Sequence, residues 1–128
     1  MTGPGAQRHV LLVDDDPDIR YIAEIALARV GGLAVSLAGS AAEARVRLEG
    51  PLPDVLLLDV TMPLCDGPTF FRELRQDGRF AALPIIFLTA RTSLDDVQGF
   101  LDMGVHGVVA KPFDPMTLAK QLGGMLGW

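Results

Sequence analysis

Residues 10–20 read VLLVDDDPDIR, an apolar run that ends directly in three aspartates. The apolar part is typical of a buried strand, and Asp16 before Pro17 has the form of a helix N-cap followed by proline at the first helical position. Capping explains one aspartate and leaves Asp14 and Asp15 unexplained. Neighbouring carboxylates repel one another, and such a cluster is normally tolerated when a cation lies between them. The stretch therefore predicts a strand, a metal-binding loop and a helix.

The same order of strand, loop and helix recurs along the chain. Apolar β-type runs alternate with segments whose apolar residues recur at helical spacing, and glycine or proline marks most boundaries. Continuous apolar strands are typical of a parallel sheet covered on both faces, so we expect an α/β, doubly wound, three-layered fold. The expected strands are 9–13, 33–38, 53–59, 83–89 and 107–111, and the expected helices are 17–30, 40–50, 69–76, 93–103 and 114–123.

Length and composition fit one soluble globular domain. The chain has 128 residues, of which 49% are hydrophobic, and this suffices for a single core. We expect a flexible stretch at residues 1–8 and one domain over residues 9–128. The net charge of -5 argues against direct nucleic-acid binding. One cysteine, no run of transmembrane length and no signal peptide predict a cytoplasmic protein that does not enter a membrane.

Polar residues stand at the ends of otherwise apolar strands. Asp14 and Asp15 follow the first strand, Asp59 ends the third, Thr89 the fourth and Lys111 the fifth. Ligands bind at the carboxyl ends of the strands in an open parallel sheet, so we expect these side chains to share one crevice. Three carboxylates suit Mg²⁺, and Asp59, on the most apolar strand, is the candidate nucleophile for an aspartyl phosphate. Lys111 and Thr89 would contact phosphoryl oxygens.

In the order and spacing of these motifs, residues 9–125 resemble the receiver domain of bacterial two-component response regulators. The motifs are the acidic pair, LLLDVTMPLCDG around Asp59, FLTA around Thr89 and KPF from Lys111. The resemblance implies a flavodoxin-like five-stranded sheet of strand order 2-1-3-4-5. It also implies that Asp59 takes a phosphoryl group from a sensor histidine kinase or phosphotransfer protein, and that a surface then changes toward an effector protein or output domain.

The same resemblance assigns metal ligands. Asp15, Asp59 and the backbone carbonyl of Thr61 would bind Mg²⁺ directly, and Asp14 would act through a water molecule. The domain would carry out its own phosphorylation and dephosphorylation chemistry in the service of a switch, without being an enzyme in the usual sense. Hydrolysis of the aspartyl phosphate would end the signal.

The resemblance also assigns the phosphate-binding and switch positions. Thr89, Ala90 and Lys111 would contact the phosphoryl group, and the bond from Lys111 to Pro112 would be cis. Family members usually carry an aromatic switch residue at the position that Val108 occupies here. Because Val108 has no ring, we expect a weaker or differently built switch.

Other functions remain open at this stage. DDDPD after the first strand also resembles the start of haloacid-dehalogenase-type phosphatases, in which Asp14 would be the acceptor, but this reading leaves Asp59 unexplained. A receiver-like docking module that works without phosphorylation is a second alternative. A flavin protein of the same topology would need hydroxyls and free amides where this chain has acids. The sequence leaves open whether the fourth and fifth helices form a homodimer.

Overall fold

In the computed structural model, which describes residues 7–128, strands and helices alternate as the sequence pattern predicts. The expected flexible stretch at residues 1–8 includes residues 1–6, which lie outside the described residues. The strands are β1 (His9–Val13), β2 (Ala34–Ala38), β3 (Val55–Asp59), β4 (Ile85–Thr89) and β5 (Gly107–Ala110). The helical segments are α1 (Pro17–Glu24), η1 (Ile25–Val30), α2 (Ala41–Leu48), α3 (Gly67–Arg75), η2 (Gly78–Phe80), α4 (Leu94–Met103) and α5 (Leu118–Leu126).

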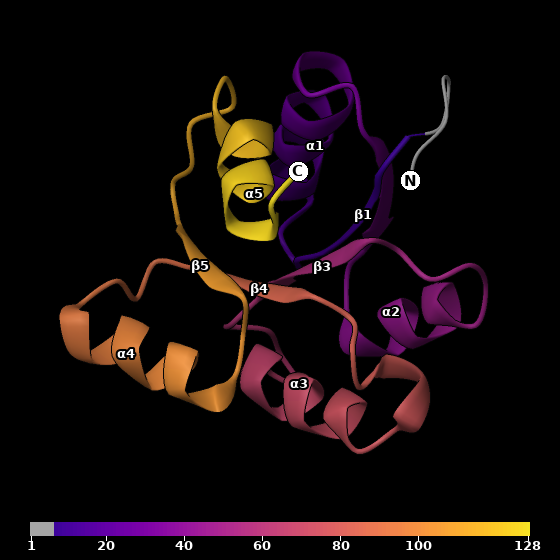
Figure 1. The fold of residues 1–128 in the computed structure, drawn as a ribbon, viewed down its shortest axis with the longest axis vertical. Coiled ribbons are helices and arrows are strands. Elements are labelled where there is room, and N and C mark those ends of the chain that lie inside the picture. The colour runs from indigo at the N-terminus through magenta and orange to yellow at the C-terminus, as the bar shows by residue number, and fades with distance from the viewer. Residues whose placement is uncertain (1–6) are drawn as a thin grey trace.

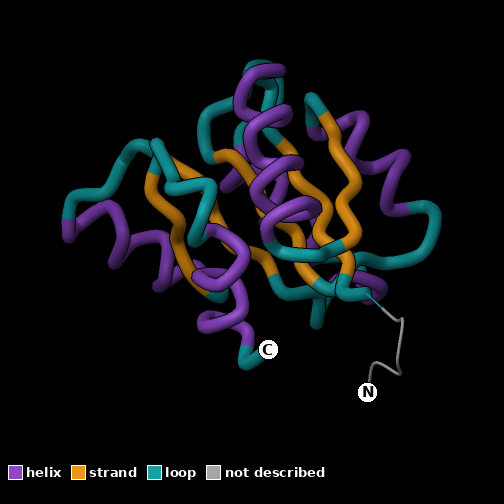
Figure 2. The backbone as a smooth tube through the Cα atoms, turned by 90° about the horizontal axis from the view of Figure 1, so that it is seen from above, coloured by secondary structure: helices purple, strands orange, loops and turns teal. Residues whose placement is uncertain are grey.

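The five strands form one parallel sheet in the order β2-β1-β3-β4-β5. Helices α1 and α5 cover one face of the sheet, and α2, α3 and α4 cover the other (Figure 1). Seen from above, the strands run side by side, with helices in front of and behind them (Figure 2). The predicted flavodoxin-like, doubly wound α/β fold is confirmed. The chain leaves β1 toward β2 and then crosses back to β3, so a crevice is expected at the carboxyl ends of β1 and β3.

Hydrophobic side chains fill both spaces between the sheet and the helices. Every position of β3 and β4 is buried, as expected for central strands covered on both faces. On the side of α3 and α4, the Phe87 ring packs edge to face against Phe71 and Phe100, with centroids 5.8 and 5.3 Å apart. These contacts fix β4 against two helices, and they thereby fix the position of Thr89 at its end.

Aspartate side chains cap the N-termini of two helices that flank the crevice. Asp16 accepts a hydrogen bond from the backbone N–H of Asp18 at 2.9 Å, which confirms the predicted cap of α1. Asp66 accepts one from the N–H of Thr69 at 2.8 Å. Helix α3 therefore begins at Gly67 and not at residue 69, because the cap lies in the loop that we expected to precede the helix.

The start predicted for the last helix is wrong. The side chain of Asp114 accepts a hydrogen bond from the N–H of Met116 at 2.9 Å, which forms a local turn instead of a helix cap, and α5 begins only at Leu118. The helix also continues past its predicted end to Leu126, where Gly127 with φ 77° terminates it.

The helix after β1 changes its winding halfway. Its second half, η1, is a π-helix, which the helical spacing of apolar residues did not predict. The N–H of Gly31 donates to the carbonyl of Ala26 at 3.1 Å, five residues earlier. A side chain at Gly31 would overlap the Cβ of Ala119, so this glycine permits η1 and α5 to approach closely.

Candidate functional site

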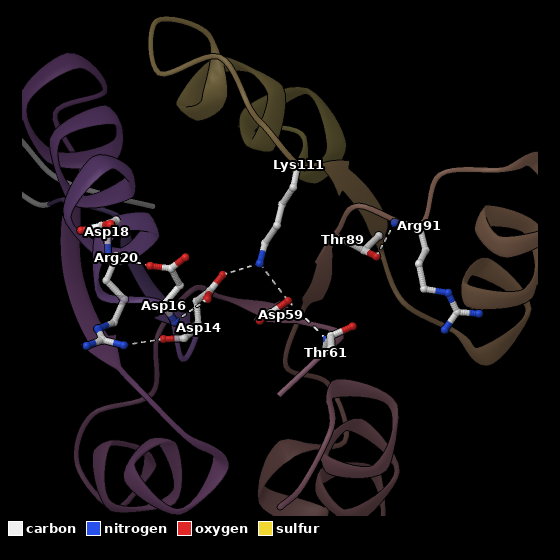
Figure 3. Close-up of polar contacts among 9 residues, drawn as sticks. All are labelled: Asp14, Asp16, Asp18, Arg20, Asp59, Thr61, Thr89, Arg91 and Lys111. Carbon is white, nitrogen blue, oxygen red and sulfur yellow. Dashed lines mark hydrogen bonds and ion pairs between the residues drawn. The ribbon is translucent and has the colours of Figure 1, made fainter. Parts of the chain in front are cut away.

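Acidic side chains from the carboxyl ends of β1 and β3 meet in one crevice, and a lysine from beyond β5 reaches into it (Figure 3). Carboxylate oxygens of Asp14, Asp15 and Asp59 all lie within 4.8 Å of one another. The ammonium Nζ of Lys111 lies 2.7 Å from Oδ2 of Asp14 and 3.0 Å from Oδ1 of Asp59. The structure therefore brings together four of the five polar side chains that we expected, from their positions at strand ends, to share one crevice.

The fifth side chain, Thr89, ends β4 beside β3 and is buried. Its hydroxyl accepts a hydrogen bond from the backbone N–H of Arg91 at 2.8 Å. Figure 3 shows Thr89 on the opposite side of Asp59 from Asp14. The hydroxyl thus closes the turn after β4 and keeps its own proton to donate elsewhere.

Asp14 is fully buried and only partly satisfied. Its Oδ1 accepts a hydrogen bond from the backbone N–H of Asp16 at 2.9 Å. Its backbone carbonyl accepts a hydrogen bond from the guanidinium of Arg20 at 2.7 Å. Its Oδ2 accepts no well-directed hydrogen bond from the described residues, although the ammonium of Lys111 lies 2.7 Å away. A buried carboxylate oxygen in this state favours a further cation in the crevice.

Asp59 is ionised less easily than an ordinary aspartate. Burial, followed by the negative charge of Asp14, raises the pKa of Asp59 from 3.8 to about 6, although Lys111 and the N–H of Thr61 oppose the rise. A divalent cation between the carboxylates would favour the ionised form. Asp15 is solvent-exposed, so ligands from solution can reach one side of the cluster. This set of hard oxygen donors fits Mg²⁺.

Lys111 remains positively charged in this environment. Burial alone lowers the pKa of Lys111, but its close contacts with the negatively charged Asp14 and Asp59 outweigh burial, so the pKa lies above its ordinary value. The ammonium therefore offsets one of the two negative charges of the buried carboxylates when no metal is bound. The same position places a cation beside any group attached to Asp59.

The remaining predicted positions lie on or directly after β4 and β5. Ala90 is exposed directly after β4, and Val108 is half-buried in β5 against the core on the α3 and α4 side. The peptide bond between Lys111 and Pro112 is cis.

The structure adds two supporting residues whose roles sequence reasoning missed. Arg20 ends the stretch that opens α1 and holds the backbone of Asp14, as described above. Gly67 lies against the end of β3: an added Cβ would overlap the carbonyl oxygen of Asp59 and lie 2.9 Å from the Cα of Val60. The DG pair in the loop signalled a special backbone, but it gave no hint of this long-range contact.

Asp59→Asn is expected to stabilise the metal-free protein at pH 7 by about 1–3 kcal/mol. Because the pKa of Asp59 rises from 3.8 to about 6 on folding, folding takes up a proton between these values. The stability of the natural protein therefore falls as pH rises through this window. The side-chain amide of the variant does not titrate, so the variant lacks this fall in stability. Urea unfolding in EDTA at pH 5 and pH 7 measures both effects. The exposed Asp95→Asn serves as control, and an Asp59→Asn variant less stable at pH 7 would contradict the expectation.

The order of the strands and the carboxylates and lysine at their ends define a receiver-type α/β domain. The chain belongs to the family of response regulator receiver domains, whose family model matches residues 10–123. Response regulator Rre1 of Synechocystis sp. is 42% identical over 110 residues, which cover 85% of this chain and 47% of that protein. Transcriptional regulatory protein CseB of Streptomyces coelicolor is 35% identical over 94% of this chain and 50% of its own length. The chain thus spans about half the length of these relatives.

Solved structures agree with the family match. Chemotaxis protein CheY4 of Vibrio cholerae superposes with a TM-score of 0.85 at 34% identity, covering 94% of this chain and 100% of that one. The predicted family, fold and function as a receiver domain of two-component signalling are confirmed. The comparisons lend no support to a phosphatase that uses Asp14, a flavin protein or a phosphorylation-independent docking module. Among residues 7–128, no helix combines the length and apolarity needed to cross a bilayer.

Proposed function

We propose that residues 9–128 form one cytoplasmic receiver domain that accepts a phosphoryl group on Asp59 from a sensor histidine kinase or phosphotransfer protein. The observation that carries the proposal is the contact of one lysine with two buried carboxylates at the strand ends. An Asp59 carboxylate oxygen attacks phosphorus while the bond from phosphorus to the donor nitrogen breaks. Water later hydrolyses the aspartyl phosphate, which restores the carboxylate and releases inorganic phosphate.

The residues around Asp59 have separate roles in this transfer. Asp14, Asp15, Asp59 and the Thr61 carbonyl would hold Mg²⁺, which supplies positive charge to the transferring group when bound. Lys111 shifts from its contact with the Asp59 carboxylate to a phosphoryl oxygen. The movement is small because Nζ already lies 3.0 Å from Oδ1 of Asp59, the residue that would carry the phosphoryl group. Lys111 thereby offsets the charge that the phosphoryl group brings into a buried site.

We assign the signal-dependent change to Thr89 and Ala90. The Thr89 hydroxyl donates to a phosphoryl oxygen, and the backbone N–H of Ala90 donates to another. This draws the turn after β4 toward Asp59, and the change reaches an effector protein or an output domain. The side chain of Val108 offers no ring to follow Thr89 inward, so the rearrangement of β5 is small.

Phosphorylation of Asp59 is tested by intact mass after incubation with acetyl phosphate. We expect one phosphoryl group on the natural chain, dependent on Mg²⁺, and none on Asp59→Asn. The matched control Asp95→Asn, which changes an exposed aspartate of α4, should incorporate the group normally. An adduct that persists in Asp59→Asn and disappears in Asp14→Asn would overturn the proposal and favour Asp14 as the acceptor.

The weak switch is tested by nuclear magnetic resonance. Beryllofluoride, a phosphoryl mimic, is expected to shift the amide signals of Thr89 and Ala90 strongly and those of residues 93–120 weakly. Val108→Tyr, which supplies the missing ring, should enlarge the shifts over residues 93–120. A full rearrangement of this region in the natural chain would contradict the role assigned to Val108.

A further inference from the structure

A groove of about 660 Å³ lies between η1 and α5, away from the phosphoacceptor site. Figure 1 shows the two segments side by side on one face of the sheet, with the C-terminus beside α5. Arg8 and Leu33 directly precede β1 and β2, so this end of the groove lies at the amino ends of the strands, opposite the edge that carries Asp59. Trp128 lines the same groove.

Glycines, which have no side chain, keep the groove open. Gly123 and Gly124 present bare backbone on α5, and an added Cβ at Gly124 would meet nothing within 4 Å. Gly31 and Ala119, which approach closely, lie where the two helical segments meet. The groove is therefore bounded by packed backbone, and its open space is accessible from solvent.

The charged side chains that line the groove are all basic. These side chains are Arg8 and Lys120, and no aspartate or glutamate among residues 7–128 lines the groove. Neither cation forms an ion pair with a carboxylate of residues 7–128. The guanidinium of Arg8 instead lies 5.0 Å from the centre of the Trp128 ring. The groove therefore combines apolar walls with two basic side chains that have no carboxylate partner among residues 7–128. This local positive charge contrasts with the net charge of -5 of the whole chain.

We propose that this groove binds a small apolar anion, an aryl or alkyl chain that ends in a carboxylate or sulfonate. Its volume falls within the range of small-molecule sites, about 300–1,000 Å³. Met116, Leu33 and Trp128 supply apolar contacts for the body of the ligand, and Arg8 or Lys120 receives the anionic group. The inference is independent of phosphorylation at Asp59.

The proposal is tested with 8-anilinonaphthalene-1-sulfonate, an aromatic sulfonate whose fluorescence rises on binding. Trp128 is the only tryptophan, so energy transfer from tryptophan to the probe reports that the probe is bound to the domain, and the variants below locate it. We expect saturable transfer, and we expect decanoate to displace the probe at least tenfold more effectively than decanol. Titration calorimetry of the full chain gives the affinities.

Variants localise the binding. Gly124→Leu, at a position where an added Cβ has free space, places a bulky side chain in the groove and is expected to weaken probe binding at least tenfold, whereas Gly124→Ala should have a small effect. Lys120→Gln and Arg8→Gln should each weaken it about threefold to tenfold. Arg72→Gln, which removes an exposed charge from α3 on the other face, is the matched control. Circular dichroism melting establishes that each variant is folded.

Three results would overturn the proposal. The first is equal loss of affinity in Arg72→Gln, which would indicate attraction to general surface charge. The second is unchanged affinity in Gly124→Leu, which would place the probe elsewhere. The third is sedimentation of the natural chain as a dimer whose formation excludes the probe, since a second copy would then cover the groove.

Discussion

Gly67→Ala is expected to lower the free energy of unfolding by about 2–3 kcal/mol, because the added methyl group has no space. It would overlap the carbonyl oxygen of Asp59 and lie 2.9 Å from the Cα of Val60. Both atoms belong to the backbone at the end of a fully buried strand, so neither can rotate away as a side chain would. Either α3 or the end of β3 must shift.

Urea unfolding of Gly67→Ala measures this cost, and a second glycine provides the matched control. Gly99 lies inside α4, and an added Cβ there meets nothing within 4 Å. Gly99→Ala should therefore raise stability by up to about 1 kcal/mol through helix propensity alone. If both variants gained stability, the close approach of α3 to the end of β3 would be refuted.

The carboxylate and lysine positions of the crevice were predictable because they depend on strand topology. Asp14 and Asp59 follow apolar runs, and parallel strands place their carboxyl ends at one edge, so their proximity follows without knowledge of any side-chain contact. Lys111 follows from the same rule, although β5 itself ends one residue earlier, at Ala110. The capping role of Asp16 is local and could be read from its neighbours alone.

The remaining features depend on contacts between segments that are distant in sequence. The π-helical winding of η1 places Gly31 against Ala119 of α5, and helical periodicity alone does not encode that approach. The start of α5 was misplaced because Asp114 and Pro115 suit both a helix cap and a tight turn. The buried and incompletely satisfied oxygen of Asp14 likewise emerges only from the folded arrangement.

Lys111→Met is expected to destabilise the metal-free protein by about 3–5 kcal/mol at pH 7, because it removes the cation between two buried carboxylates. Asp14 and Asp59 are 0% and 3% exposed, so water hydrates their carboxylates poorly once the ammonium that lies 2.7 and 3.0 Å from their oxygens is removed. Urea unfolding in EDTA measures the loss. The matched control is Lys120→Met, which removes an exposed lysine and should change stability by less than about 0.5 kcal/mol.

The loss in Lys111→Met has a predictable pH dependence. The pKa of Lys111 is raised by folding, so its stabilising contribution is complete below its ordinary value of 10.5 and is lost only as pH rises through the higher folded value. Any change between pH 5 and pH 8 therefore comes from the carboxylates. Without the ammonium, Asp59 becomes still harder to ionise, and protonation relieves the repulsion from Asp14. The variant should regain stability as pH falls toward 5.

Magnesium distinguishes this explanation from simple loss of packing. A divalent cation bound by Asp14, Asp15 and Asp59 would replace the missing positive charge, so Mg²⁺ should stabilise Lys111→Met more than it stabilises the natural chain. If the lysine acted only by filling space, Mg²⁺ would raise the stability of both proteins equally and the loss at pH 7 would persist at pH 5. That outcome would also remove the basis for assigning Lys111 as the residue that offsets phosphoryl charge, since both roles depend on the same ammonium beside the same two carboxylates.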